Sequence, residues 1–120
     1  MGGASLVGRL SLRSLRSRPF VIAGVNVIES ESQVLTTAHS LAASLRPFDV
    51  SFVFKASFDK ANRTSLSSYR GVGLQRAARL LRRVREEVGV AVVTDVHELS
   101  QPEALEGCVD MLQIPAFLCR

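Results

Sequence analysis

Short apolar runs alternate with longer amphipathic segments along most of this chain. The runs have the length of buried strands and fall at residues 20–24, 50–54, 90–94 and 110–114. In the segments between them, apolar residues recur at helical spacing. The pattern predicts the order β-α-β-α-β-α-β, in which helical crossovers join parallel strands that are buried on both faces. An α/β barrel and an open doubly wound sheet both fit this order.

The three expected helices have recognisable start and stop signals. Pro47 stops the first and Gly89 ends the second, whereas Ser100 and Pro102 start the third. A complete eight-stranded barrel takes ~250 residues, so these elements would make about half of one, and we expect the sequence to be interrupted at Arg120. Ser32 is expected to cap the first helix, which runs to about Leu45. The other two helices are expected at residues 74–88 and from Ser100 to about Gly107.

The composition is that of one globular domain, with 47% hydrophobic and 22% charged residues among 120. No apolar run approaches the ~20 residues that cross a bilayer, so no membrane partner is expected. Cys108 and Cys119 have the spacing of neither a disulfide framework nor a zinc site, which favours free thiols in a reducing cytoplasm.

The first 28 residues are basic and serine-rich and contain no acidic residue. This composition fits an organelle transit peptide, but core-like sequence begins at once with Phe20. We favour a basic N-terminal arm at residues 1–19, formed by a strand or hairpin that caps the bottom of the fold. A partial barrel domain at residues 20–120 would follow it. An organelle location is the alternative to the cytoplasm.

Arginines cluster in the second helical segment, at positions 76, 79, 82, 83 and 85. Such a cluster could neutralise nucleic-acid phosphates. Because the arginines interleave with apolar residues at helical spacing, a solvated outer helix face is the better interpretation. No nucleic-acid partner is expected.

The densest polar sequence is F-K-A-S-F-D-K-A-N-R-T-S at residues 54–65, at the end of the second expected strand. Barrel active sites are built at this end of the strands. Lys55, Lys60 and Arg63 suit phosphate and carboxylate ligands, because arginine offers a bidentate fork to anionic oxygens. From composition alone, ordinary solvated loop charges are the favoured interpretation.

This segment, followed by S-Y-R-G at residues 68–71, resembles the signature of 3-deoxy-D-manno-octulosonate 8-phosphate synthases. Three further blocks agree in order and separation: N-V-I-E-S at 26–30, T-D-V-H-E at 94–98 and L-Q-I-P-A-F-L-C-R at 112–120. The resemblance covers essentially residues 20–120. It implies the first half of a TIM (β/α)8 barrel, from a transferase that condenses phosphoenolpyruvate with D-arabinose 5-phosphate and water.

The resemblance also implies roles for individual residues. Asn26, Lys60 and Asp95 would be catalytic, and Lys60 would serve in proton transfer. Phosphoenolpyruvate would be held by Lys55, Ser57 and Lys60, and the sugar phosphate by Asn62, Arg63 and Thr64. Asp95 would accept hydrogen bonds from sugar hydroxyls, Gln113 would line the pocket floor, and Arg120 resembles an arginine that is donated across a subunit interface.

Asn26 stands where one subclass of the family has a cysteine metal ligand, so the resemblance implies a metal-independent enzyme with no cofactor. The His97-Glu98 dipeptide supplies no set of metal ligands, and no role is expected for His39. Val25 and Val72 stand where the family more often has proline, which puts the rigidity of their loops in doubt.

Two alternatives stay open. The related barrel enzyme that condenses phosphoenolpyruvate with erythrose 4-phosphate differs in the K-A-N-R-T-S block. A truncated fragment would be inactive, because it lacks the groups that the resemblance places beyond Arg120. In full-length form the expected assembly is a homo-oligomer, a tetramer by the resemblance.

Overall fold

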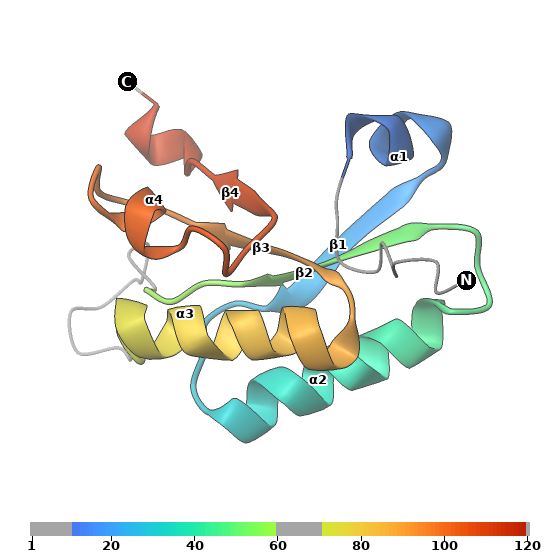
Figure 1. Cartoon of the computed structure of the whole chain (residues 1–120), viewed down its shortest axis with the longest axis horizontal. Helices are drawn as coiled ribbons and strands as arrows, with labels where there is room; N and C mark the ends of the chain where they lie inside the picture. Colours follow the sequence, from blue (N-terminus) through green and yellow to red (C-terminus); the bar gives the residue numbers. More distant parts are fainter. Residues whose placement is uncertain (1–10, 60–70, 120) are drawn as a thin grey trace.

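The computed structural model describes residues 11–59 and 71–119. Figure 1 shows a sheet with helices packed along it. In chain order the elements are α1 (Leu12–Ser17), β1 (Phe20–Val25), α2 (Glu31–Leu45), β2 (Ser51–Ala56), α3 (Leu74–Arg83), η1 (Val84–Val88), β3 (Ala91–Asp95), α4 (Gln101–Ala104), β4 (Met111–Gln113) and η2 (Ala116–Leu118). Within the described residues, no helix is both long enough and apolar enough to span a membrane.

The sheet has its strands in sequence order, β1-β2-β3-β4, and each neighbouring pair is parallel. A doubly wound sheet instead reverses its strand order at a switch point, where the ligand binds. Unbroken sequence order with helical crossovers is the arrangement of a (β/α)8 barrel. The sheet is therefore the first half of such a barrel, and the predicted fold class is confirmed.

Helices α2 and α3 cover one face of the sheet (Figure 1). Strand side chains alternate between the two faces, so every second strand residue enters the core beneath these helices. The largest fully buried members of this core are Phe54, Ile28, Leu81, Leu105, Val34, Val84 and Val92. Val53, Ala91 and Val93 form a smaller cluster with Met111 on the opposite face, which would be the inner face of a closed barrel.

The start of α2 differs from the prediction, because Ser30 and not Ser32 is the N-cap. The Ser30 hydroxyl accepts the backbone N–H of Gln33 at 3.1 Å. The Gln33 side chain in turn accepts the N–H of Glu29 at 2.8 Å. Two otherwise orphaned donors are thereby satisfied, as in a capping box, and Glu31 in the first turn complements the helix dipole.

The basic arm and the strand boundaries also differ in part. Residues 12–17 form a helix and not the expected strand or hairpin, because the Ser11 and Ser14 side chains cap each other's backbone N–H groups. The predicted strands are confirmed with shifts of one or two residues at their ends. The expectation that the strands are buried on both faces holds for β3, which is buried throughout, but not for the outer strands β1 and β4 of this sheet, whose residues are half-buried or exposed.

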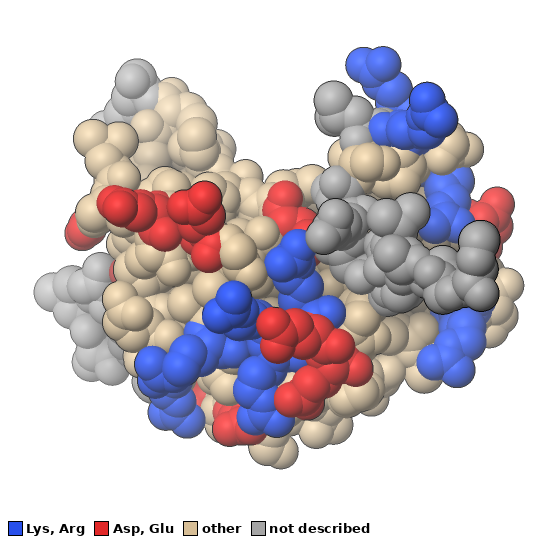
Figure 2. Space-filling model, in the orientation of Figure 1, with Lys and Arg blue, Asp and Glu red and all other residues tan. Residues whose placement is uncertain are grey.

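The outer face of α3 is charged, as the solvated-face interpretation expects. Lys and Arg side chains gather over this helix in Figure 2, with acidic side chains among them. Arg83 pairs with Glu31 of α2 and with Glu87, so it links the two helices. A hydrogen bond from Arg83 also lowers the pKa of the exposed Glu87 carboxyl below its usual value.

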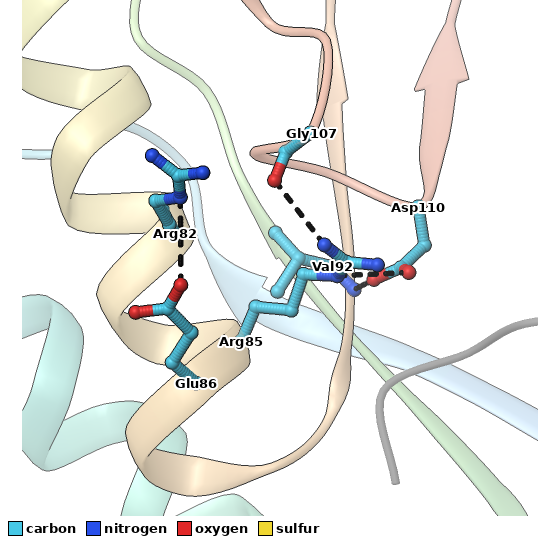
Figure 3. Close-up of polar contacts among 6 residues, drawn as sticks. All are labelled: Arg82, Arg85, Glu86, Val92, Gly107 and Asp110. Atoms are coloured by element: carbon cyan, nitrogen blue, oxygen red, sulfur yellow. Dashed lines mark hydrogen bonds and ion pairs between the residues drawn. The ribbon is translucent and has the colours of Figure 1, made fainter. Parts of the chain in front are cut away.

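The second helical segment is wound as a π-helix in its last turn, Val84–Val88, and Gly89 ends it in the left-handed conformation. Arg85 lies on this turn. Its Nε donates to Asp110 Oδ1 at 3.0 Å and its Nη1 donates to the Gly107 carbonyl at 3.2 Å (Figure 3). One residue of the helix thereby holds the segment that leads from α4 into β4.

Asp110 completes this network from the other side. Its Oδ2 accepts the N–H of Val92 at 2.9 Å, and its own N–H donates to the Val92 carbonyl at 2.8 Å (Figure 3). The Asp110 side chain is only 5% exposed. Because these contacts lie before β4, they fix the register of β4 against β3 and hence the positions of both C-terminal ends.

We expect Asp110→Ala to lower the free energy of unfolding by about 2–4 kcal/mol, because it leaves a buried N–H and a half-buried guanidinium without their acceptor. Urea unfolding followed by circular dichroism measures this. Glu86→Ala is the matched control, because it removes the exposed Arg82–Glu86 pair drawn in Figure 3. Its effect should stay within about 0.5 kcal/mol, and equal effects of both variants would contradict the assigned role of Asp110.

Candidate active site

The C-terminal ends of the four strands meet at one edge of the sheet. Lys55, Asp95 and Gln113 lie at these ends on β2, β3 and β4. Asp95 is paired in register with Gln113, and Lys55 is paired with Val93, two residues before Asp95. Because residues two apart on a strand share a face, all three side chains belong to the inner face.

Lys55 has a glycine as its neighbour on the other side, since Gly24 of β1 is its partner in register. A Cβ at Gly24 would collide with the Lys55 backbone carbonyl. The glycine therefore permits close approach of β1 to β2 beside the lysine. Asn26 follows β1 at the same edge and is exposed.

Asp95 is buried, at 8% exposure, and contacts His97. The His97 Nε2 lies 3.1 Å from Asp95 Oδ2, and the side chains are 11% and 12% exposed. The imidazole also lies between two aromatic rings: Phe58 is edge-on at 5.8 Å between centroids, and Phe117 is stacked at 6.4 Å. These contacts leave His97 little freedom to turn away from the carboxylate.

Two polar atoms of this pair, Asp95 Oδ1 and His97 Nδ1, are buried without a hydrogen-bond partner among the described residues. Such atoms are rare in folded proteins because they cost free energy. Because Asp95 Oδ1 has almost no exposed surface among the described residues, a ligand hydroxyl could reach it only if neighbouring side chains moved.

Backbone and side-chain hydrogen bonds hold the strand ends in place. The N–H of Ile28 donates to the Ser57 carbonyl at 2.9 Å, and the N–H of Val96 donates to the Gln113 carbonyl at 3.0 Å. The buried Thr94 hydroxyl donates to the Ala56 carbonyl at 2.7 Å. Hydrogen bonds thus connect the C-terminal ends of the strands, from the loop after β1 through to β4.

The predicted site residues fall into two groups. The structure brings Lys55, Asp95 and Gln113 together, with Asn26 and the buried Ser57 at the same edge. The other predicted residues, Lys60, Asn62, Arg63, Thr64 and Arg120, lie outside the described residues. Within the described ranges, no group of three or more His, Cys, Asp or Glu side chains could hold a metal ion.

His97 is the site residue that the sequence analysis missed. It was considered only as a metal ligand, whereas the structure places it against the carboxylate of Asp95. The i, i+2 spacing in an extended segment was the available signal, because it puts both side chains on one side. Its backbone is held by the Gln101 side chain, whose Oε1 accepts the N–H of His97 at 2.7 Å.

Asp95→Asn should raise the free energy of unfolding by about 1 kcal/mol, because burying an incompletely bonded carboxylate costs more than burying an amide. The amide oxygen can still accept from His97. Urea unfolding measures the change, and Asp49→Asn is the matched control, since Asp49 is 88% exposed in its side chain. A large loss of stability in Asp95→Asn would show that the carboxylate is well satisfied.

Comparison with known proteins shows to which family the chain belongs. A sequence model of the DAHP synthetase I family matches residues 15–120. The 2-dehydro-3-deoxyphosphooctonate aldolase of Koribacter versatilis is 52% identical over 101 residues, which are 84% of this chain and 36% of that protein. The protein of the same name from Synechococcus sp. is 53% identical over 97 residues, 81% of this chain and 34% of its own length.

A third relative, 2-dehydro-3-deoxyphosphooctonate aldolase 2 of Pseudomonas putida, is 47% identical over 105 residues, 87% of this chain and 38% of its own length. The chain thus spans just over a third of the length of these relatives. Their name is a synonym of 3-deoxy-D-manno-octulosonate 8-phosphate synthase, so the resemblance found in the sequence blocks is confirmed. The family is one of (β/α)8 barrels, in agreement with the strand order. With most of its length matched, the chain belongs to the DAHP synthetase I family.

Proposed function

We propose that this chain supplies the first half of an enzyme that condenses phosphoenolpyruvate with D-arabinose 5-phosphate and water. The products would be 3-deoxy-D-manno-octulosonate 8-phosphate, a precursor of lipopolysaccharide or cell-wall sugars, and inorganic phosphate. The observation that carries the proposal is the alignment of Lys55, Asp95 and Gln113 on the inner face, in a chain about half identical to octulosonate aldolases.

The proposed reaction forms one carbon–carbon bond. C3 of phosphoenolpyruvate attacks the aldehyde carbon of the sugar phosphate, whose oxygen becomes a hydroxyl on gaining a proton. Water adds at C2, and the C2–O bond to the phosphoryl group breaks to release phosphate. The protein's main task is to hold two polyanions side by side, which opposing cationic groups can do by offsetting their charge.

Each residue at or near the C-terminal strand ends is assigned a role in this reaction. Lys55, Ser57 and Lys60 would hold phosphoenolpyruvate, with Lys60 also moving a proton. Asn62, Arg63 and Thr64 would bind the sugar phosphate, and Gln113 would line the floor.

Asp95 is proposed to accept hydrogen bonds from sugar hydroxyls. Two properties of its carboxylate support this role: it lies at the end of β3, and one oxygen lacks a donor among the described residues. The carboxylate is also buried and held by His97, so it is oriented before any ligand arrives.

The complete enzyme is proposed to be a cytoplasmic homo-oligomer, a tetramer by the family resemblance, in which Arg120 reaches a neighbouring subunit. An organelle location through the basic arm is the alternative. A polypeptide of residues 1–120 alone should be inactive, since half a site holds a ligand without the groups that oppose it.

Erythrose 4-phosphate is the second candidate sugar, because the matching family model is described by the DAHP synthetase activity. The curated relatives of known name favour the octulosonate reaction instead. The test should therefore compare arabinose 5-phosphate with erythrose 4-phosphate as the aldehyde substrate.

The sharpest test grafts residues 20–120 of this chain onto the corresponding part of the Koribacter versatilis relative, which supplies the other half of the barrel. We expect phosphate release from phosphoenolpyruvate and arabinose 5-phosphate at ~1–10³ s⁻¹, the ordinary range for enzymes. Asp95→Asn in the graft should lower kcat/KM about ten- to a hundred-fold, because a charge-assisted hydrogen bond is worth ~1.5–3 kcal/mol.

The ungrafted relative and the free 120-residue chain serve as the positive and negative controls. Faster turnover with erythrose 4-phosphate would transfer the proposal to the second sugar. A folded graft that is inactive with both sugars would refute the function.

The same graft tests metal independence. Asn26 offers an amide where a thiolate ligand would stand in the metal-dependent subclass, and amides bind transition metals more weakly than thiolates. Activity should therefore survive prolonged treatment with a chelator, measured by phosphate release before and after dialysis. Loss of activity that a divalent metal restores would assign the chain to the other subclass.

A further inference from the structure

Strands β2 and β3 part from each other before either strand ends. Their last register partners are Lys55 and Val93. One position further on, Ala56 is still paired with β1 and Thr94 is still paired with β4. Among the described residues, Ala56 and Thr94 are not register partners of each other, so the sheet divides here into a β1–β2 pair and a β3–β4 pair. The division lies inside the sheet, away from both outer strands (Figure 1).

Hydrogen bonds continue within each pair of strands beyond this division. On the β1–β2 side, the N–H of Ile28 donates to the Ser57 carbonyl at 2.9 Å. On the β3–β4 side, the N–H of Val96 donates to the Gln113 carbonyl at 3.0 Å. Each pair therefore stays intact past the point where the two pairs separate.

The groups proposed to hold the two substrates divide along the same line. Lys55 and Ser57, which would hold phosphoenolpyruvate, belong to the β1–β2 pair. Asp95, which would bind the sugar, belongs to the β3–β4 pair. The carbon–carbon bond of the proposed reaction has to form across the division. The spacing between the two pairs of strands therefore controls how closely the reacting carbons approach.

The Thr94 side chain spans the division. Its hydroxyl donates to the Ala56 carbonyl at 2.7 Å, and the residue is fully buried. Ala56 lies between Lys55 and Ser57 in the sequence, and Thr94 directly precedes Asp95. One hydrogen bond thus ties the backbone that carries the phosphoenolpyruvate groups to the backbone that carries the sugar-binding carboxylate.

The apolar packing around Thr94 does not by itself call for a threonine. The residues two positions before and after it, Val92 and Val96, belong to the core beneath the helices. Valine has nearly the same shape as threonine, and burying a hydroxyl costs free energy unless it is hydrogen-bonded. The bond to the Ala56 carbonyl is therefore what distinguishes threonine from valine at this position.

A ring contact also crosses the division, closer to the site. Phe58 meets His97 edge-on, with 5.8 Å between the ring centroids. Contacts between rings tolerate sliding, whereas a hydrogen bond prefers a narrow range of length and direction. Thr94 is thus better suited than the ring contact to fix the spacing.

We propose that Thr94 is a positioning residue that sets the spacing between the two substrate-binding parts of the site, an inference that rests on the proposed function. Its side chain lies on the helix-covered face, opposite to the face of Asp95, so it acts through the Ala56 backbone and touches neither substrate. Without the hydroxyl, each substrate still meets its own binding groups. The reacting carbons are no longer held at the right distance, so the loss falls on kcat and not on KM.

The test uses the graft of residues 20–120 onto the Koribacter versatilis relative. Thr94→Val removes the donor at nearly constant volume. We expect kcat for phosphate release to fall about ten- to a hundred-fold, because a misplacement of ~1 Å can cost about a hundred-fold. KM for each substrate should change by less than about threefold. Thr94→Ser keeps the hydroxyl and should recover kcat to within about threefold of the parent graft.

Val92→Ala is the matched control, because Val92 lies on the same strand and face, is fully buried, and has no side-chain donor. It should lower the midpoint of urea unfolding and leave kcat within about twofold of the parent graft. A purely structural role for Thr94 would give this same pattern in Thr94→Val.

The outcomes separate this proposal from the proposed function. An active parent graft in which Thr94→Val keeps its kcat, or only raises KM, would overturn the role of Thr94 and leave the function standing. A folded parent graft without activity would refute the function and this role together. If Thr94→Val does not fold, Thr94→Cys replaces it, because a thiol of similar size is only a weak donor. Equal kcat values for Thr94→Cys and Thr94→Ser would then overturn the proposal.

Discussion

Parallel pairing between neighbouring strands is the constraint on which the rest of this structure depends. It brings all C-terminal strand ends to one edge, so that residues far apart in the sequence, such as Lys55 and Gln113, share a surface. It also requires helical crossovers, which here bury one face of the sheet beneath α2 and α3. The network around Asp110 fixes the register at the opposite end of β4. A shift of one residue there would turn Gln113 from the inner face to the outer.

Periodicity was enough to predict the elements but not the details of their ends. The strand runs and the glycine stop at Gly89 are strong local signals, and the structure contains them. Ser32 was the expected start of α2, but the S-x-x-Q spacing from Ser30 to Gln33 makes Ser30 the N-cap. The π-turn that brings Arg85 to Asp110 depends on a contact 25 residues away, which no local pattern can reveal.

The position of the candidate site, but not its contacts, could be predicted from where the expected strands end. Lys55, Asp95 and Gln113 lie at or next to the ends of expected strands, which places them at one end of the sheet. Their common face follows from the strand register, and their chemical roles rest on the family resemblance. The contact between His97 and Asp95 was not anticipated, because it depends on Phe58 and Phe117 closing around the imidazole. The carboxylate of Asp95 is buried, yet one of its oxygens lacks a hydrogen-bond donor among the described residues. Most buried polar groups are paired, and exceptions of this kind are typical of functional positions.

Sequence order in the sheet also bears on how the chain folds during synthesis. Strands β2, β3 and β4 each pair with the strand made just before them, so none of these three waits for a partner that has not yet left the ribosome. The sheet can therefore grow by one unit at a time at the β4 edge, while β1 keeps its outer edge from the start. Contacts between successive units close shorter loops than contacts across the whole sheet would, although each parallel pair still has to wait for its helical crossover to form. The same order means that β1 stays open longest, so the nascent chain is most exposed to wrong partners at its first strand.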